Sequence, residues 1–345
     1  MSSEQNQPLA PPASPEIKRQ MEEHAQIIRS LYDGDIPLFT KHGLRRAGQQ
    51  LDQYAEGKLE NNEMLIDNIK GNTIRVPIPG LLDLVFLAGH KLVVNRRPLI
   101  KYGTIQCLTA KVEFPIWNPD TAYLTLDPVY VYTSPNSTTT LSASKLEQLL
   151  KTSKLEWEST PQYAALATLV ASSPVLSKAR KIVGFALGPV VGPDSVGERD
   201  NCSLMQYCLL LSLRELVAAR SSSSSSGSDE VRCFAQDPDL CPAAAEALQS
   251  AGVAVLDDPY AFTEVDDATV VVSISPNVPV KQVIAEIARP AAIMWLAASV
   301  DEEKGIRLTD PTSTKVEGML ENEYVDLNFP YYEPFRDITL YARKE

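Results

Sequence analysis

The chain has 345 residues, of which 44% are hydrophobic and 22% charged, and its formal net charge is −12. This is an ordinary globular composition, which excludes a collagen-like chain, a disordered chain and a disulfide scaffold. No apolar run is long enough to span a bilayer, and the first residues have neither the basic nor the apolar part of a secretion signal. We therefore expect a soluble cytoplasmic protein with no membrane association. A nucleic-acid role would need a local basic patch, because the overall field repels phosphate.

The N-terminal part of the chain predicts helices followed by short strands. Residues 1–13 are rich in Pro, Ser and Gln and are expected to form a disordered tail. Ser14-Pro15-Glu16 is typical of a helix start, and apolar spacing predicts one helix up to Asp33 and a second over 40–56. The stretch 60–135 alternates apolar and polar residues, as in TIRVPIP, TIQCLTAKVEF and LTLDPVYVY. We expect residues 14–160 to form a small irregular α+β region.

From residue 181 onward, strands and helices alternate. The apolar strand KIVGFALGPV leads into a Gly-Pro loop, and residues 201–219 form a long helix. Further strands are predicted in VRCFAQDP, VAVLDDP, ATVVVSISPNVP and AAIMWLA, with helices in PAAAEALQSAG and VKQVIAEIA. This order predicts a Rossmann-like, mostly parallel sheet with helices on both faces over residues 161–300. Residues 301–345 are expected to be an acidic, loop-rich extension whose aromatic residues pack on the body.

Several standard sites are excluded by the residues present. The chain has only three histidines, and it contains no HExxH motif, no paired Cys/His spacing and no GxxxxGK[ST] loop. The loop after the first parallel strand has glycines four apart instead of GxGxxG, which disfavours a nicotinamide-dependent oxidoreductase. We therefore expect neither a metal nor another cofactor.

The ends of the first two parallel strands hold candidate binding groups. The helix that begins near Asn201–Ser203 could donate N–H groups to an anion or a developing oxyanion, or it could be a plain strand–helix connection. Asp237, after the second strand, could accept ribose hydroxyls or simply cap the next helix.

Two charged stretches are also candidates. Residues 257–267 hold five carboxylates with two aromatic residues, which suits a guanidinium or ammonium ligand and equally suits a solvated acidic loop. Basic clusters occur around residues 41–46, 91–101 and 178–181. Each of these could be ordinary surface, but together on one face they could hold a phosphate backbone.

The ordered motifs of the second half resemble fungal members of the sensitivity-to-red-light-reduced (SRR-like) domain family. They are Gln236-Asp237-Pro238, Asp257-Asp258-Pro259…Phe262, Ser275-Pro276-Asn277-Val-Pro279 and Ala288-Arg289-Pro290-Ala291. The resemblance covers about residues 178–298 and continues more loosely upstream from PLFTKHGL. The family is known mainly as a regulator, but a fungal branch looks like arginine-containing cyclodipeptide synthases. That branch has an acidic DDxxE-type motif, and here Ala261 stands where its Glu would be.

The resemblance implies a tRNA-dependent cyclodipeptide synthase that condenses arginyl-tRNA with a second aminoacyl-tRNA to a cyclo-Arg-X diketopiperazine, without metal or cofactor. The alternative is a non-catalytic SRR-like regulatory or scaffold protein. Ser195 is the first candidate nucleophile and Ser203 the second. The proposed proton relays are Tyr207 and Tyr260.

Substrate and tRNA contacts complete the predicted site. The guanidinium of arginine is expected between Asp257, Asp258 and Glu264, where Glu264 takes part only if the loop folds back. Tyr260 and Asp237 are expected in the same substrate site. The basic residues expected to guide the tRNA acceptor stems are Lys91, Arg96, Arg97, Lys101, Arg45 and Arg46.

Overall fold

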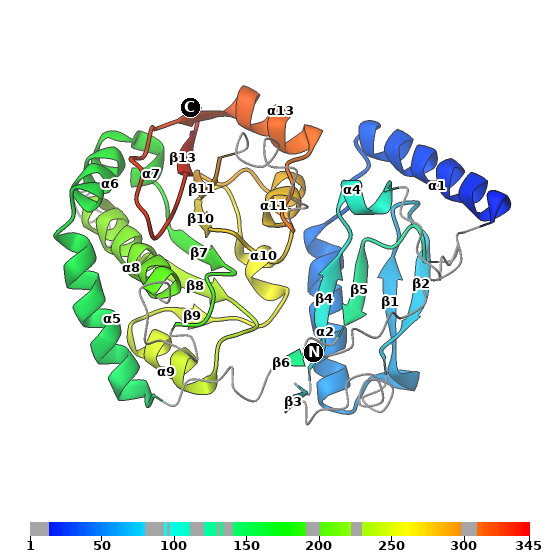
Figure 1. Ribbon diagram of the computed structural model, residues 1–345, viewed down its shortest axis with the longest axis horizontal. Coiled ribbons are helices and arrows are strands. Elements are labelled where there is room, and N and C mark those ends of the chain that lie inside the picture. The colour runs from blue at the N-terminus through cyan, green and yellow to red at the C-terminus, as the bar shows by residue number, and fades with distance from the viewer. Residues whose placement is uncertain are drawn as a thin grey trace, which may run out of the picture.

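A computed structural model describes residues 14–79, 93–94, 97–110, 121–129, 132–133, 141–190, 201–221, 230–297 and 309–345. The chain forms two parts that pack side by side, a smaller N-terminal region in blue and cyan and a larger α/β domain in green to red (Figure 1). The predicted tail over residues 1–13 lies outside the described residues.

Two capped helices open the N-terminal region. Helix α1 (Pro15–Asp33) begins after Ser14, whose hydroxyl accepts a hydrogen bond from the Ile17 amide at 3.3 Å. Helix α2 (Lys41–Ala55) begins after Thr40, whose hydroxyl accepts from the Gly43 amide at 3.0 Å. Both helices are confirmed close to their predicted ends, because side-chain caps fix helix starts locally.

Short antiparallel strand pairs follow the two helices. The pairs are β1 (Glu63–Asp67) with β2 (Thr73–Pro77), β4 (Leu99–Tyr102) with β5 (Leu126–Val129), and β3 (Val93–Val94) with β6 (Tyr132–Thr133). A 3-10 turn, η1 (Glu60–Asn62), precedes β1. The strand expected in TIQCLTAKVEF is wrong at its start, where Ile105–Leu108 form the short helix α4. The Thr104 hydroxyl caps this turn by accepting from the Cys107 amide at 3.0 Å.

A seven-stranded sheet forms the centre of the larger domain, in the order β12-β13-β11-β10-β7-β8-β9. The strands are β7 (Lys181–Phe185), β8 (Arg232–Gln236), β9 (Ala254–Val255), β10 (Thr269–Ser273), β11 (Ala292–Leu296), β12 (Tyr324–Asp326) and β13 (Ile338–Arg343). The five strands from β7 to β11 are mutually parallel, and β13 runs antiparallel to both β11 and β12. The predicted Rossmann-like, mostly parallel sheet is confirmed.

Helices cover both faces of this sheet (Figure 1). One face carries α5 (Ala143–Glu158), α6 (Pro161–Ser172), α7 (Pro174–Ser177), α8 (Asn201–Ser221) and α9 (Pro242–Ser250). The other carries α10 (Tyr260–Glu264), α11 (Val280–Ile287) and α13 (Thr314–Glu323). Neighbouring residues of one strand point to opposite faces, so Ile182 joins the first core and Val183 the second.

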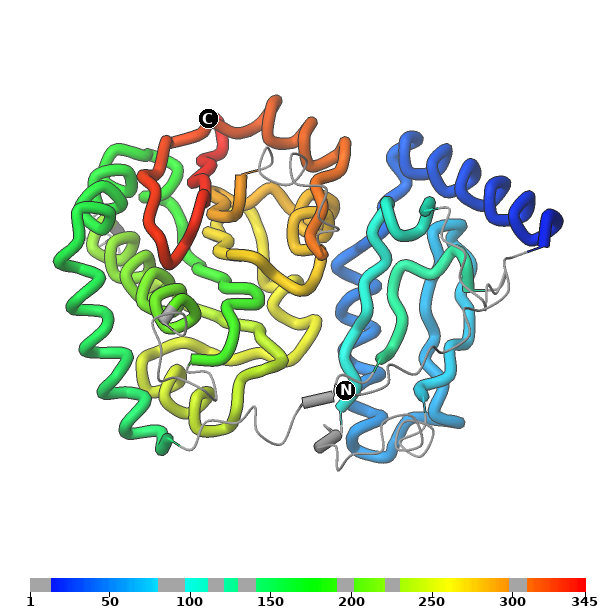
Figure 2. The backbone as a smooth tube through the Cα atoms, in the orientation of Figure 1, coloured from blue at the N-terminus to red at the C-terminus, as the bar shows by residue number. Residues whose placement is uncertain are grey.

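The N-terminal region shares the second of these cores. Buried residues of α1, α2 and β1, among them Ile28, Leu44 and Met64, form one apolar cluster with Val183, Val271 and others of the sheet. Helix α2 of the N-terminal region packs directly against α10 of the larger domain, where the two parts meet (Figure 2). The two parts are therefore joined by a continuous hydrophobic core.

The predicted segment boundaries differ from the structure at both ends of the α/β domain. Helix α5, assigned by the sequence to the N-terminal region, packs on α8 and α9. The segment expected to be a loop-rich C-terminal extension supplies β12 and β13 to the sheet. Its aromatic residues do pack on the body, because buried Phe335 lies edge-on against Trp157 with ring centroids 5.2 Å apart.

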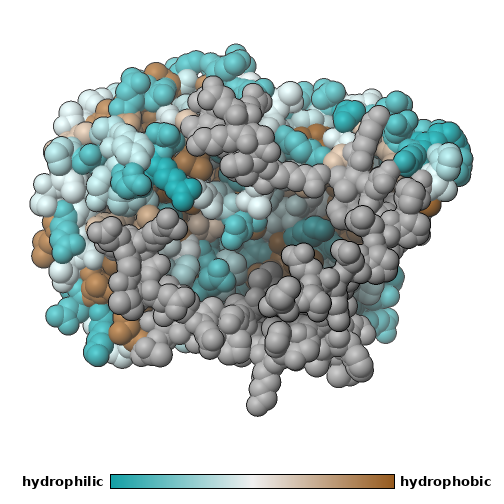
Figure 3. All heavy atoms as spheres, viewed as in Figure 1, coloured by the Kyte–Doolittle hydropathy of each residue, from teal (hydrophilic) through white to brown (hydrophobic). Residues whose placement is uncertain are grey.

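Among the described residues, one helix meets the length and composition of a membrane span. Helix α8 is apolar and long enough to cross a membrane, with a mean hydropathy of 1.3 over Cys202–Arg220, but 61% of that stretch is buried in the fold. On the coloured surface of Figure 3, hydrophobic side chains lie in small groups among polar ones. A cytoplasmic location stays a prediction.

Candidate functional site

A cavity of about 280 Å³ lies at the carboxyl ends of β7, β8 and β10. In the sheet, β8 lies beside β7 on one side and β10 lies beside it on the other, so the strand order reverses at β7. Open α/β sheets bind ligands in the crevice at such a reversal. The polar residues around the cavity are Ser203, Gln206, Gln236, Asp237, Asp239, Asp258, Ser275 and Asn277.

The loop after β7 is held in close contact with the start of α8. Gly188 has a φ of +81°, and a Cβ there would lie 2.3 Å from the Ser203 hydroxyl oxygen, so a larger residue does not fit. Tyr207 donates its hydroxyl to the Gly188 carbonyl at 2.8 Å, and the Gly188 amide donates to Asp237 at 2.6 Å. Tyr207 is fully buried, and burial holds the pKa of its hydroxyl well above the usual range. Tyr207 therefore supports the loop, and its role as a proton relay stays a prediction.

Asp237 is placed to accept hydrogen bonds at the cavity wall. Its two carboxylate oxygens accept from the amides of Gly188 and Asp239, at 2.6 Å and 2.9 Å. Burial is the largest influence on this group and raises its pKa to about 6, although both amides oppose the shift. A carboxyl group that changes charge near neutral pH can take or release a proton during a reaction.

Asp258 links the N-terminal region to the sheet through hydrogen bonds. One oxygen accepts from the Tyr102 hydroxyl at 2.5 Å and from the Gln236 amide group at 2.9 Å, and the other accepts from the Ile100 amide at 2.8 Å. The residue is 9% exposed, and burial raises its pKa to about 6. Three donors from its own chain therefore already occupy this carboxyl group.

The acidic stretch does not form the single guanidinium site that the sequence predicted. Asp257 is exposed, whereas Asp258 is buried at the carboxyl end of the sheet. The first residues of β7 and β8 are Lys181 and Arg232. Glu264 Oε2 lies 3.7 Å from Lys181 Nζ and 3.9 Å from Arg232 Nη2. Five-residue strands separate the two ends of the sheet, so the loop does not fold back to bring Glu264 to Asp258.

Tyr260 also lies outside the cavity in which the sequence placed it. Its hydroxyl donates to Asp52 of α2, and burial together with the Asp52 carboxylate raises its pKa to about 12. Asp52 is in turn paired with Arg97 at 2.7 Å. Tyr260 therefore belongs to the contact between α2 and α10 and does not reach the cavity lining.

Of the two candidate nucleophiles, one can be placed. Ser203 lines the cavity in the first turn of α8, where backbone N–H groups lack helical partners. Ser195 lies outside the described residues.

One buried residue of α8 was missed by the sequence reasoning. Gln206 also lines the cavity and is 7% exposed, and its Oε1 atom has no hydrogen-bond partner within the described part of the chain. The signal was a single Gln inside the otherwise apolar run LMQYCLLL. Gln236 was missed too: it accepts from the Ala261 amide at 2.9 Å and holds the loop that carries Asp258.

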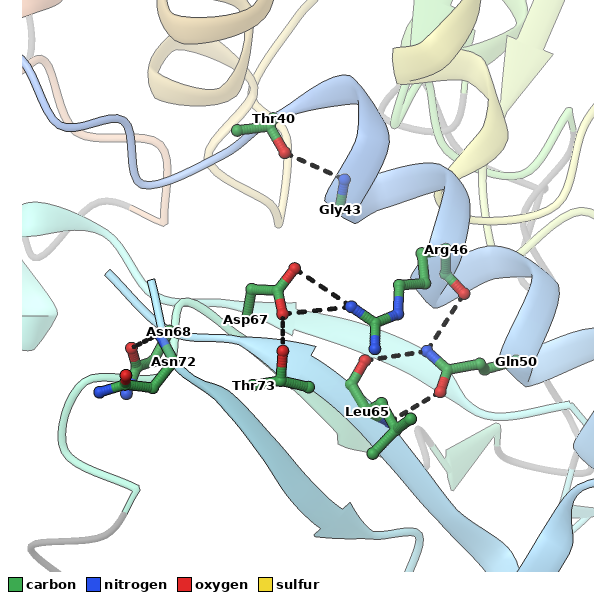
Figure 4. A network of polar contacts seen from close by, with 9 residues as sticks. All are labelled: Thr40, Gly43, Arg46, Gln50, Leu65, Asp67, Asn68, Asn72 and Thr73. Atoms are coloured by element: carbon green, nitrogen blue, oxygen red, sulfur yellow. Dashed lines mark hydrogen bonds and ion pairs between the residues drawn. The ribbon is translucent and has the colours of Figure 1, made fainter. Parts of the chain in front are cut away.

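The predicted tRNA-binding residues do not act as one free cluster. Arg97 is enclosed between Asp52 and the Asp258 carbonyl, with 11% of its side chain exposed. Arg46 donates to both oxygens of Asp67, at 3.1 Å and 3.2 Å, and thereby ties α2 to the β1–β2 pair (Figure 4). Arg45 and Lys101 are exposed.

Two of the expected tRNA contacts, Lys91 and Arg96, lie outside the described residues. The described ranges hold no group of three or more His, Cys, Asp or Glu side chains arranged to bind a metal ion.

Comparison with known proteins identifies the family. A search of curated proteins gave no match. Among solved structures, an O-methyltransferase family protein from Burkholderia thailandensis is similar at 12% identity and a TM-score of 0.29, over 52% of this chain and 55% of that one. The family model of the SRR1 domain matches residues 147–342, more than half of the sequence. The chain therefore belongs to the SRR1 domain family.

Proposed function

We propose that the chain is a tRNA-dependent cyclodipeptide synthase and that the cavity at the carboxyl end of the sheet is its active site. The observation that carries this proposal is the chemistry of the cavity wall. Asp237, Asp239 and Gln206 supply hydrogen-bond acceptors, and none of the described lining residues is Lys or Arg. Such a wall favours a substrate that brings donors and positive charge, as an arginyl group does.

The reaction begins at Ser203. Its hydroxyl oxygen attacks the ester carbonyl of arginyl-tRNA, the bond to the tRNA ribose breaks, and the proton of the hydroxyl passes to the departing ribose oxygen. The α-amine of the second aminoacyl-tRNA then displaces Ser203 and forms the first peptide bond. The arginyl amine finally attacks the second ester, which closes the diketopiperazine and releases the second tRNA.

Two features of the site support these steps. Backbone N–H groups of the first turn of α8 have no carbonyl partner within the helix, and they can stabilise the negative charge that develops on the ester oxygen. Asp237 adjoins the same Gly188 loop as Ser203 and has a pKa of about 6, which suits a group that moves protons at neutral pH.

The proposal places the guanidinium in the cavity instead of the stretch 257–264. Asp239 is exposed at the cavity rim, and within the described part of the chain no side chain donates to its carboxylate. It is therefore the acid best able to pair with arginine. Arg45 and Lys101 remain exposed and can contact tRNA phosphates outside the cavity.

Ser203→Ala tests the proposal with purified protein. Incubated with arginyl-tRNA alone, the wild-type chain is expected to gain the mass of one arginyl group, and the variant is expected to gain none. Ser172→Ala is the matched control, because Ser172 is exposed at the end of α6 and bonds only to the Leu169 carbonyl. The proposed nucleophile is wrong if Ser203→Ala is labelled like wild type. Absence of both label and product with folded wild-type protein would contradict the function itself.

A further inference from the structure

We infer that this cavity binds a ribonucleoside joined to an amino acid, with a free ribose hydroxyl on Asp237, a donor of the ligand on Gln206 Oε1, and no phosphate inside the cavity. The inference rests on the proposed function only in taking the cavity as the active site. It adds which part of the substrate enters and which residues recognise it.

The position of Asp237 in the sheet points to ribose. The strands β9-β8-β7-β10-β11 have the order 3-2-1-4-5, and Asp237 directly follows β8, the second of them. In sheets of this order, an acid at the end of the second strand accepts hydrogen bonds from ribose hydroxyls. The Gly188 and Asp239 amides hold the carboxylate of Asp237 in place, and each oxygen keeps a further lone pair for a ligand.

The charge around the cavity argues against a phosphate. Asp237, Asp239 and Asp258 line it, and no Lys or Arg is among its described lining residues. In dinucleotide-binding sheets the loop after the first strand donates backbone N–H groups to the pyrophosphate. Here the Gly188 amide already donates to Asp237. The ligand is therefore a nucleoside whose substituent inside the cavity is neutral or cationic.

Gln206 supplies an independent sign of a ligand. Its side chain is more than nine-tenths buried at the cavity wall, and Oε1 lacks a partner among the described residues. A buried acceptor without a donor destabilises the fold, so a bound molecule, either an ordered water or a ligand in the cavity, is expected to satisfy it. An amino or hydroxyl group of the ligand would do so.

The size of the cavity fits one nucleoside. At about 280 Å³ it is close to the lower end of the range of roughly 300–1,000 Å³ that is usual for small-molecule sites. A dinucleotide would need a site further up that range.

Two sources supply this chemistry, and binding measurements distinguish them. One is the aminoacylated terminal adenosine of tRNA, for which puromycin is a stable mimic. The other is a free adenosyl sulfonium, S-adenosylmethionine. We expect calorimetry on the full chain to show binding of at least one of the two, with NAD and the corresponding 2′-deoxynucleoside at least tenfold weaker. Tighter puromycin binding assigns the tRNA end, and tighter S-adenosylmethionine binding assigns the free sulfonium.

Two buried glutamines make a matched pair of variants. Gln206→Leu removes an acceptor that has no described partner, so we expect about tenfold weaker nucleoside binding and an unchanged or higher Tm. Gln282→Leu removes an amide that accepts from the Ile105 amide at 3.1 Å and donates to Gln106 and to the Pro311 carbonyl, so we expect a lower Tm.

The inference is overturned if neither nucleoside binds, if NAD binds as tightly, or if Gln206→Leu binds like wild type. Product formation without nucleoside recognition would contradict this inference alone. Nucleoside binding without any cyclic dipeptide would contradict the proposed function alone.

Discussion

Two neighbouring aspartates, Asp257 and Asp258, have opposite surroundings. Asp257 is exposed, whereas Asp258 is buried and accepts from the Tyr102 hydroxyl, the Ile100 amide and the Gln236 side chain. At the scale of single residues, Asp258 therefore stabilises the contact between the two parts of the chain, and its sequence neighbour does not.

We expect Asp258→Ala to lower the free energy of unfolding by about 3 kcal/mol or more at pH 5, because three buried donors lose their acceptor. Urea denaturation followed by circular dichroism measures this change. Asp257→Ala is the control and is expected to change stability by less than about 0.5 kcal/mol. Equal effects of the two substitutions would show that Asp258 does not fasten the region.

The residue scale is also where the sequence was least informative. Tyr102 and Ile100 are 156 and 158 positions from Asp258, so no local pattern indicates their contacts. The acidic composition of 257–267 predicted a ligand site. In the structure, Asp258 and Glu264 lie at opposite ends of the sheet, so they do not form one site. Asp237 was found, because its place directly after a buried strand is readable from the sequence.

At the scale of elements, caps and periodicity predicted what lies close together in the chain. Helix α1 begins at the predicted cap, α2 begins within one residue of its predicted start, and the parallel strands lie where apolar runs were seen. Strands β12 and β13 were missed because β13 pairs antiparallel with the distant β11, and β12 is held in the sheet only through β13. Pairing between such distant segments leaves no periodic signal near either partner.

In the structure, the C-terminal segment is part of the core, and its contribution to stability can be measured. Phe335 is fully buried against Trp157, so we expect Phe335→Ala to lower the free energy of unfolding by about 3–5 kcal/mol. Tyr331, four residues earlier and 56% exposed, gives the matched control Tyr331→Ala with a change of about 0.5 kcal/mol or less. Chemical denaturation of both variants decides this point. A small effect of Phe335→Ala would mean that the segment is a dispensable extension.

At the scale of the whole molecule, buried acids couple stability to pH. Burial raises the pKa of Asp237 and Asp258 from 3.8 to about 6, so the folded chain binds more protons than the unfolded chain between pH 4 and 6. The stabilisation from these two groups is present below about pH 4 and is lost as the pH rises through 6. The net charge of −12 adds repulsion in the same direction.

We therefore expect the unfolding free energy of the ligand-free protein to be lower at pH 7 than at pH 5, by roughly 1 kcal/mol for each of the two groups. Nucleoside affinity should change in the opposite direction, because the ribose site needs the Asp237 carboxylate. Among the described residues, the charged or titratable groups near Asp237 are Asp239, Asp258 and the Tyr207 hydroxyl. Urea titrations and calorimetry at both pH values test this. Stability that rises from pH 5 to pH 7 would contradict it.

The central claim is that the cavity at the carboxyl end of the sheet makes cyclic dipeptides that contain arginine. Mass spectrometry of extracts from cells that express this chain tests it most directly, because the host supplies every aminoacyl-tRNA. We expect a new mass equal to arginine plus a second amino acid less two waters, and we expect it to be lost in cells that express Ser203→Ala. If soluble, folded wild-type protein yields no such mass, or if Ser203→Ala gives an undiminished signal, the cavity does not make these products through Ser203.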